Sequence, residues 1–256
     1  MKRLFLGILC LGALLLSFNP AFAHEFLLKP YFFTLAPGYD DPFQIVSSHV
    51  YMLSEEMEPL DKVSCFLYSQ EGKEQVKLAA NENLLTLDGK ITLNNQGTYI
   101  LAAHRQGMIW TKTTTGWKQQ SKKGLTGVLK SGLYEKFAKA IINVGTPNSF
   151  YQKRIGQTLE LIPLKNPKEI KVGQELPVQV LFKGKPINIK VQASYDRFSM
   201  HENTYAYSTE AEDNGIAYIK ITSPGIWMVR AEHSEKVNSP DYDQHVIRSV
   251  LTFEVR

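Results

Sequence analysis

Cysteine is scarce in this sequence of 256 residues, which contains only Cys10 and Cys65. Long apolar runs are equally scarce, because the one clear example, from Leu4 to Phe18, lies at the N-terminus. If that segment is removed, Cys65 is the only cysteine left and no disulfide can form within the chain. The fold must then be stabilised by burial of apolar surface.

The N-terminus has the three-part layout of a cleavable export signal. Lys2 and Arg3 precede the apolar run, and small residues at Ala21 and Ala23 follow it. We therefore predict that residues 1–23 are a signal peptide and that the mature chain begins at His24. The run is too short for a convincing membrane span, so we expect a periplasmic or secreted protein without a span in its mature form.

Concentrated charge and known catalytic motifs are also missing. Loss of Lys2 and Arg3 lowers the formal net charge from +4 to +2, and no basic block remains to bind nucleic acid. There is no Gly-x-Ser-x-Gly elbow, no phosphate-binding loop and no spaced carboxylate pair typical of a hydrolase. We therefore predict that the protein has no nucleic-acid partner and is not an enzyme.

Short runs of alternating apolar and polar residues fill most of the chain, which is typical of β-strands. Proline, glycine and charged residues interrupt this pattern between Leu161 and Pro177, which indicates a domain boundary. We predict an all-β fold of two β-sandwich domains, an N-terminal one over 24–160 and an immunoglobulin-like one over 161–256. One segment differs: the apolar spacing from Leu133 to Val144 predicts a short helix near 132–144, with Gly145 as its C-cap.

Histidine is the residue type that points to a function. After cleavage, His24 offers both its α-amine and its imidazole to one metal ion, and the amine loses its proton at modest cost near neutral pH. His49 stands before the acidic residues Glu55, Glu56 and Glu58. We therefore predict His24 and His49 as metal ligands.

The alternation of side chains along a strand indicates which face two more histidines occupy. His233 and His245 share the parity of the core residues of their strands, so a hairpin would bring both to the core-facing side at its loop end. A core-facing imidazole needs a partner, which a metal or a carboxylate can supply. We predict His233 and His245 as further ligands, while the roles of His104 and His201 stay open.

The donors are nitrogen atoms without a thiolate pair, which suits nickel, cobalt, copper or zinc. No metal motif with fixed spacing is present, so the residues alone leave the choice among these metals open.

Several segments resemble an exported domain family described as the periplasmic component of cobalt/nickel transport. They are Ala23-His24-Glu25-Phe26, Gly97–Ala103 followed by Trp110-Thr111-Lys112, Tyr134–Ala140, Gly184-Lys185-Pro186, Gly225-Ile226-Trp227 and Leu251–Val255. The resemblance implies a two-sandwich fold and a role in nickel or cobalt uptake beside a membrane metal transporter. His24 and His49 fit the family's N-terminal pattern, and His233 and His245 fit its C-terminal pattern.

Two other functions remain open at this stage. An N-terminal histidine brace can hold copper for oxidative chemistry on a polymer, which would make the protein an enzyme. A structural or adhesive β-sandwich module would need no metal, and its histidines would be incidental.

Overall fold

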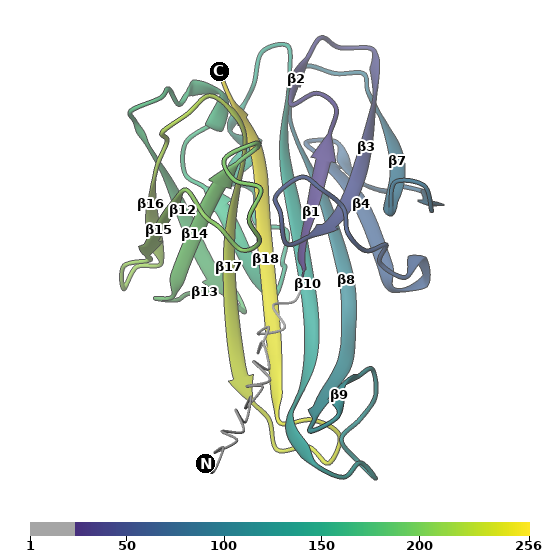
Figure 1. Ribbon diagram of the computed structural model, residues 1–256. Helices are drawn as coiled ribbons and strands as arrows, with labels where there is room; N and C mark the ends of the chain where they lie inside the picture. Colours follow the sequence, from purple (N-terminus) through teal and green to yellow (C-terminus); the bar gives the residue numbers. More distant parts are fainter. Residues whose placement is uncertain (1–23) are drawn as a thin grey trace, which may run out of the picture.

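A computed structural model describes residues 24–256, and the predicted signal peptide lies outside these residues (Figure 1). The described chain is nearly all β, which confirms the predicted class. Its helices are three short 3₁₀ turns, η1 (Leu60–Lys62), η2 (Ser149–Gln152) and η3 (Pro167–Glu169). Within residues 24–256, no helix has the length and apolar character needed to cross a membrane.

The largest sheet runs through the middle of the molecule in the order β15-β14-β17-β18-β10-β8-β4-β5. β10 pairs in parallel with β18 and antiparallel with β8. The short strand β2 pairs with β10, and the short strand β9 pairs with β8. The strands of this central sheet are β2 (Thr34–Leu35), β4 (Val63–Ser69), β5 (Gly72–Gln75), β8 (Gly97–Thr113), β9 (Gly116–Lys118), β10 (Val128–Val144), β14 (Lys190–Tyr195), β15 (Tyr207–Glu210), β17 (Gly225–Lys236) and β18 (Gln244–Val255).

Two smaller sheets complete the fold. The N-terminal outer sheet has the order β1-β3-β7-β6, and the C-terminal outer sheet has the order β11-β12-β13, with β16 on the other side of β12. Their strands are β1 (Glu25–Pro30), β3 (Tyr39–Ser48), β6 (Leu78–Asn81), β7 (Thr86–Leu93), β11 (Leu159–Pro163), β12 (Glu175–Phe182), β13 (Lys185–Pro186) and β16 (Ile216–Lys220).

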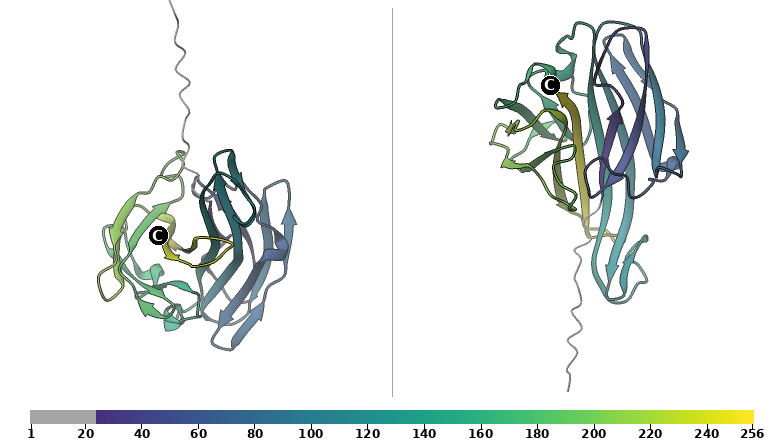
Figure 2. Two further views of the ribbon diagram at one scale, coloured as in Figure 1. Left: turned by 90° about the horizontal axis from the view of Figure 1, so that it is seen from below. Right: turned by 45° about the horizontal axis from the view of Figure 1, so that its top comes forward.

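The two outer sheets cover opposite faces of the central sheet. Ile100 and Phe137 pack into the core under the C-terminal outer sheet. Their neighbours Leu101 and Ala138 pack into the core under the N-terminal outer sheet. Because successive strand residues point to opposite faces, β8 and β10 contribute to both cores. Figure 2 shows the resulting two sandwiches side by side.

Strand order confirms the immunoglobulin-like sandwich predicted for the C-terminal half. β11, β12 and β16 lie in one sheet, and β14, β17 and β18 lie in the other. Taken in chain order, this division places strands A, B and E opposite C, F and G, as in an immunoglobulin domain. The boundary predicted near residue 160 stays a prediction, and the central sheet contains strands from both sides of it.

The helix predicted near residues 132–144 is wrong, because this whole segment lies within β10. Phe137 and Ile141 face one core, whereas Ala138 and Ile142 face the other. A strand buried on both faces has no apolar–polar alternation, so its apolar residues can fall at helical spacing by chance. Gly145 does have the expected positive φ of 56°, but it follows a strand.

Lys139 makes β10 still harder to recognise as a buried strand from the sequence, because it is a charged residue within that strand. Its Nζ lies 2.8 Å from Glu160 Oε1, and the two side chains are 1% and 3% exposed. Glu160 also accepts hydrogen bonds from the backbone N–H groups of Ile155 and Gly156. Burial lowers the pKa of Lys139, and the nearby Glu160 carboxylate opposes this.

We expect Lys139→Met to lower the free energy of unfolding by about 3–5 kcal/mol, because it leaves the Glu160 carboxylate buried without its cation. Lys139→Met/Glu160→Gln removes both charges and should recover more than half of the loss. Urea denaturation of the three proteins measures this. A single variant as stable as the native protein would contradict the pairing.

We expect Asp41 of β3 to make the stability of the folded protein depend on pH. It is fully buried, and its Oδ1 accepts a hydrogen bond from Phe32 N at 3.2 Å. Burial raises its pKa to about 6. The folded protein therefore holds the proton between about pH 4 and 6, where the unfolded chain releases it, and stability falls across that range.

Relative to Asp41→Asn, the native protein should lose at most about 3 kcal/mol of unfolding free energy between pH 4 and pH 7. Urea titrations at both pH values measure the difference. Parallel pH dependences of the two proteins would show that the Asp41 carboxyl does not titrate in this way.

Candidate metal centre

Strand pairing brings the first two histidines together. β1 and β3 pair antiparallel with Glu25 opposite Ser48. His24 precedes Glu25 and His49 follows Ser48, so the two histidines stand opposite each other one step beyond the ladder. Their ring centroids are 3.9 Å apart. The register of one strand pair therefore places His24 against His49.

The loop after His49 folds back and places the Glu55 carboxylate beside both histidines. Glu55 Oε1 accepts hydrogen bonds from the backbone N–H groups of His49 and Val50, at 2.9 and 3.1 Å. Glu55 Oε2 lies 2.9 Å from His49 Nδ1 and 3.6 Å from His24 Nε2. Burial favours the neutral acid, but the contacts with His49 and Val50 outweigh it and lower the pKa of Glu55.

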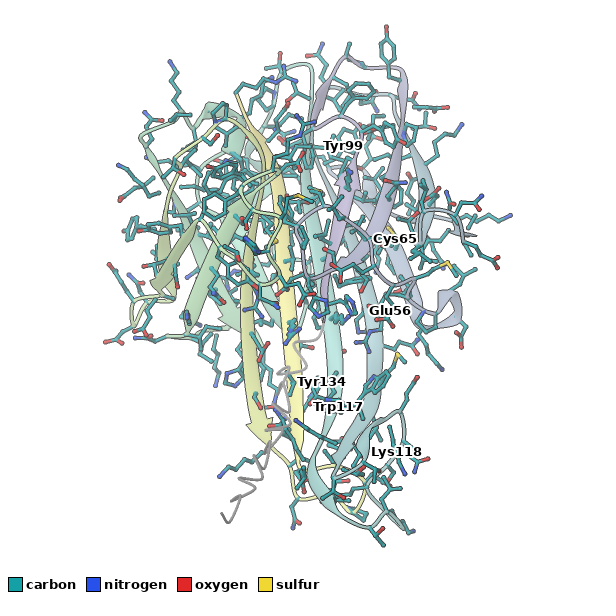
Figure 3. The ribbon with its side chains drawn as sticks, viewed as in Figure 1. Glu56, Cys65, Tyr99, Trp117, Lys118 and Tyr134 are labelled. Carbon is teal, nitrogen blue, oxygen red and sulfur yellow. The ribbon has the colours of Figure 1, made fainter. Side chains whose placement is uncertain are left out.

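Glu56 adds a second carboxylate on the other side of the His24 ring. Its Oε2 lies 2.9 Å from His24 Nδ1. This contact is the main reason that the pKa of Glu56 is lowered. Figure 3 places Glu56 at the lower end of the N-terminal sandwich, above Tyr134 and Trp117 on the long β8–β10 hairpin.

A buried ion cluster fixes the loop behind these ligands. Glu58 is 2.6 Å from Lys136 Nζ and 3.4 Å from Arg105 Nε, and it accepts a hydrogen bond from Ser47. Burial raises the pKa of Glu58, but Lys136 and Arg105 more than offset this and keep the carboxylate ionised. Because Lys136 and Arg105 belong to β10 and β8, the loop is tied to the central sheet.

A second ion cluster holds the start of β1. Glu25 Oε1 is 2.7 Å from Arg230 Nε and accepts a hydrogen bond from the Tyr205 hydroxyl at 3.0 Å. Arg230 also contacts Glu232, which in turn pairs with Arg248 of the next strand. Glu25 is therefore anchored to β17, and the position of His24 beside it is restricted.

The donor set suits a divalent transition metal. One ligand atom each from His24, His49 and Glu55 can be chosen so that all three lie within 4.8 Å of one another. Two imidazoles and a carboxylate are the ligand types that borderline metals such as Zn²⁺, Ni²⁺ and Co²⁺ accept. Buried Cys65 does not belong to this group, and burial raises the pKa of its thiol to about 12.

The other predicted ligands lie elsewhere. His233 packs against Phe182 of β12, with ring centroids 4.4 Å apart. His245 Nε2 lies 2.9 Å from Glu135 Oε2. Neither belongs to the group formed by His24, His49 and Glu55. Their roles as ligands stay predictions, whereas the hairpin of β17 and β18 on which they were placed is present.

Glu55 and Glu56 are site residues that the sequence predictions did not name as ligands. A signal was present, because both stand in the acidic segment just after His49. What could not be read from the sequence is that the loop folds back by hydrogen bonds to His49 and Val50.

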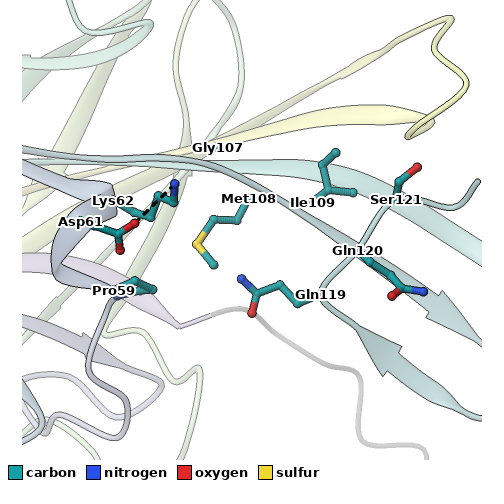
Figure 4. A pocket seen from close by; sticks show the side chains of 9 residues that line it. All are labelled: Pro59, Asp61, Lys62, Gly107, Met108, Ile109, Gln119, Gln120 and Ser121. Carbon is teal, nitrogen blue, oxygen red and sulfur yellow. Dashed lines mark ion pairs between the residues drawn. The ribbon is translucent and has the colours of Figure 1, made fainter.

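A pocket of about 520 Å³ opens between η1 and the β8–β9 hairpin, and Figure 4 shows its lining. The only ion pair among its residues joins Asp61 and Lys62, at 3.5 Å. None of the histidines lines it, so the pocket is separate from the group formed by His24, His49 and Glu55. The lining residues are Pro59, Asp61, Lys62, Gly107, Met108, Ile109, Gln119, Gln120 and Ser121.

Fold and site together describe an all-β double sandwich with clustered histidines and carboxylates at the first residue of the expected mature chain. The chain belongs to the family defined as domain of unknown function DUF4198, whose model matches residues 21–235. No curated protein matches the chain.

Solved structures give only weak superpositions. The D0-D1 domain of intimin is 14% identical, covers 89% of this chain and 97% of its own, and has a TM-score of 0.25. The ectodomain of mouse nectin-like molecule 4 is 11% identical, with coverages of 91% and 65% and a TM-score of 0.24. The titin I-band fragment I67-I69 is 13% identical, with coverages of 91% and 65% and a TM-score of 0.22. Scores this low support no argument about function.

Proposed function

We propose that the mature protein, beginning at His24, binds one divalent transition-metal ion outside the cytoplasm and assists nickel or cobalt uptake. The observation that carries this proposal is the convergence of His24, His49 and Glu55 within 4.8 Å. The function is binding and delivery to a membrane transporter, without a chemical reaction on the way.

Cleavage after Ala23 strengthens the site, because it creates a free α-amine on a residue that already contributes an imidazole. The amine and Nδ1 of one histidine can chelate the same ion. Nδ1 of His24 lies 2.9 Å from Glu56 Oε2, so this carboxylate is near the ion in either case, as a ligand or as a hydrogen-bond partner. Outer partners of this kind orient histidine ligands and tune their affinity.

Charge supports a divalent ion. The pKa values of Glu55 and Glu56 are both lowered, so both carboxylates are ionised near neutral pH. Their combined charge of about −2 offsets the charge of one M²⁺ ion. Mixed nitrogen and oxygen donors favour borderline metals, and the resemblance of the sequence to a cobalt/nickel uptake family favours nickel and cobalt among them.

The test compares mature protein that starts at His24, verified by intact mass, with a variant in which Gly-Ser precedes His24. Isothermal titration with Ni²⁺ and Co²⁺ should give one tight ion for the native chain. The extension removes the chelating amine and should weaken binding by about 100-fold, or roughly 2.7 kcal/mol. His49→Ala and Glu55→Gln should each weaken binding by at least about tenfold.

His201→Ala is the matched control, because His201 is exposed and lies outside the cluster. This variant should bind as the native protein does. Equal affinity for the native, extended and His49→Ala proteins would exclude the proposed site.

A further inference from the structure

Glu135 of β10 stands between two histidines that the first site does not use. Its Oε1 lies 2.7 Å from His104 Nε2 of β8, and its Oε2 lies 2.9 Å from His245 Nε2 of β18. The three residues come from three adjacent strands of the central sheet. They are 31 and 110 positions apart in the chain, so only the sheet brings them together.

This cluster lies on the face of the central sheet opposite the first site. Glu135 shares its parity with Phe137, which packs under the C-terminal outer sheet. The adjacent Lys136 points the other way and pairs with Glu58 behind the first site. The backbone of β10 therefore separates the two groups.

The local backbone and packing orient the three side chains. The ladder between β8 and β10 shifts register between Tyr134 and Lys136, which places a bulge beside Glu135. Bulges re-aim side chains and occur often beside functional sites. The His104 ring stacks on Phe137, with centroids 4.5 Å apart and planes 7° from parallel.

Solvent can reach the cluster. The side chains of His104, Glu135 and His245 are 35%, 16% and 21% exposed. His104 and Phe137 also line a pocket of about 220 Å³. An ion can therefore approach without unfolding of either sandwich.

One ring nitrogen of the cluster lacks a well-directed hydrogen bond. His245 Nε2 is buried and makes no hydrogen bond of acceptable geometry, although Glu135 is 2.9 Å away. A buried ring nitrogen in that position lacks a well-directed partner.

We propose that His104, Glu135 and His245 form a second divalent-metal site, independent of the first and suited to Zn²⁺ or Co²⁺. Two imidazoles and one carboxylate are a ligand set that catalytic zinc sites and non-haem iron sites use, with water in the open positions. In the present arrangement each imidazole contacts a different oxygen of Glu135. The three donor atoms do not all lie within 4.8 Å of one another as those of His24, His49 and Glu55 do. Metal binding therefore requires the carboxylate to turn and the two imidazoles to move closer together, so this site is the weaker of the two.

The test is Co²⁺ titration of the mature protein, followed by d–d absorption and by calorimetric stoichiometry. The native chain should bind two ions per molecule. His49→Ala/Glu55→Gln should retain one, His104→Ala/His245→Ala should retain the tighter one, and the fourfold variant should retain neither. His201→Ala is the control, because His201 is exposed and belongs to neither cluster, and it should keep both ions.

The same titrations show separately whether the first site and the second site bind an ion. If His104→Ala/His245→Ala binds as many ions as the native chain, the second site does not exist. If the native chain binds one ion and only that double variant loses it, the second site stands and the proposed first site fails.

A measurement on the native protein covers the case in which the double variant does not fold. Zn²⁺ should shift the imidazole ¹⁵N resonances of His104 and His245 and leave those of His201 unchanged. Unshifted resonances of His104 and His245 at saturating Zn²⁺ would overturn the inference.

Discussion

The burial of β10 on both faces is the constraint on which the rest of this structure depends. Its alternate side chains serve opposite sides of the molecule: Phe137 belongs to one core and Ala138 to the other. The same alternation sends Glu135 to His104 and His245, and Lys136 to Glu58 behind the first site. A slip of one residue in the pairing of β10 would exchange all of these partners.

The candidate metal centre depends on a second register, that of β1 with β3. Each strand contributes the histidine just beyond its last ladder pair, and the loop of β3 supplies the carboxylates. The ion clusters around Glu25 and Glu58 secure both elements to the central sheet. The central sheet therefore positions groups that lie at its edge.

Buried charges of this kind are costly to desolvate, and they contribute less to stability than their short distances suggest. Their main effect is to favour one arrangement of the strands over others. Lys139 finds a carboxylate in Glu160, and Lys136 and Arg105 find one in Glu58. Any other register leaves these charges without partners, so we infer that the ion pairs favour one packing of the three sheets over its alternatives.

Local sequence patterns were sufficient to predict the class of fold and two residues of the candidate metal centre, His24 and His49. Alternating strands identified two sandwiches, because a strand with one solvated face has a period of two. The position of His24 and the acidic residues after His49 led to the prediction of His24 and His49 as metal ligands. His104 and Leu101 have opposite parity in β8, and the contact of His104 with Phe137 places the two side chains on opposite faces of the sheet.

The sequence by itself determined the alternating strands, the histidine at the expected mature N-terminus and the single cysteine of residues 24–256. Tertiary structure alone decided that 132–144 is a strand, since a segment buried on both faces has no period that reveals it. It also decided that His245 contacts Glu135, which in turn contacts His104. Such partners are set by pairing between strands far apart in the chain, and that register depends on the packing of all three sheets at once.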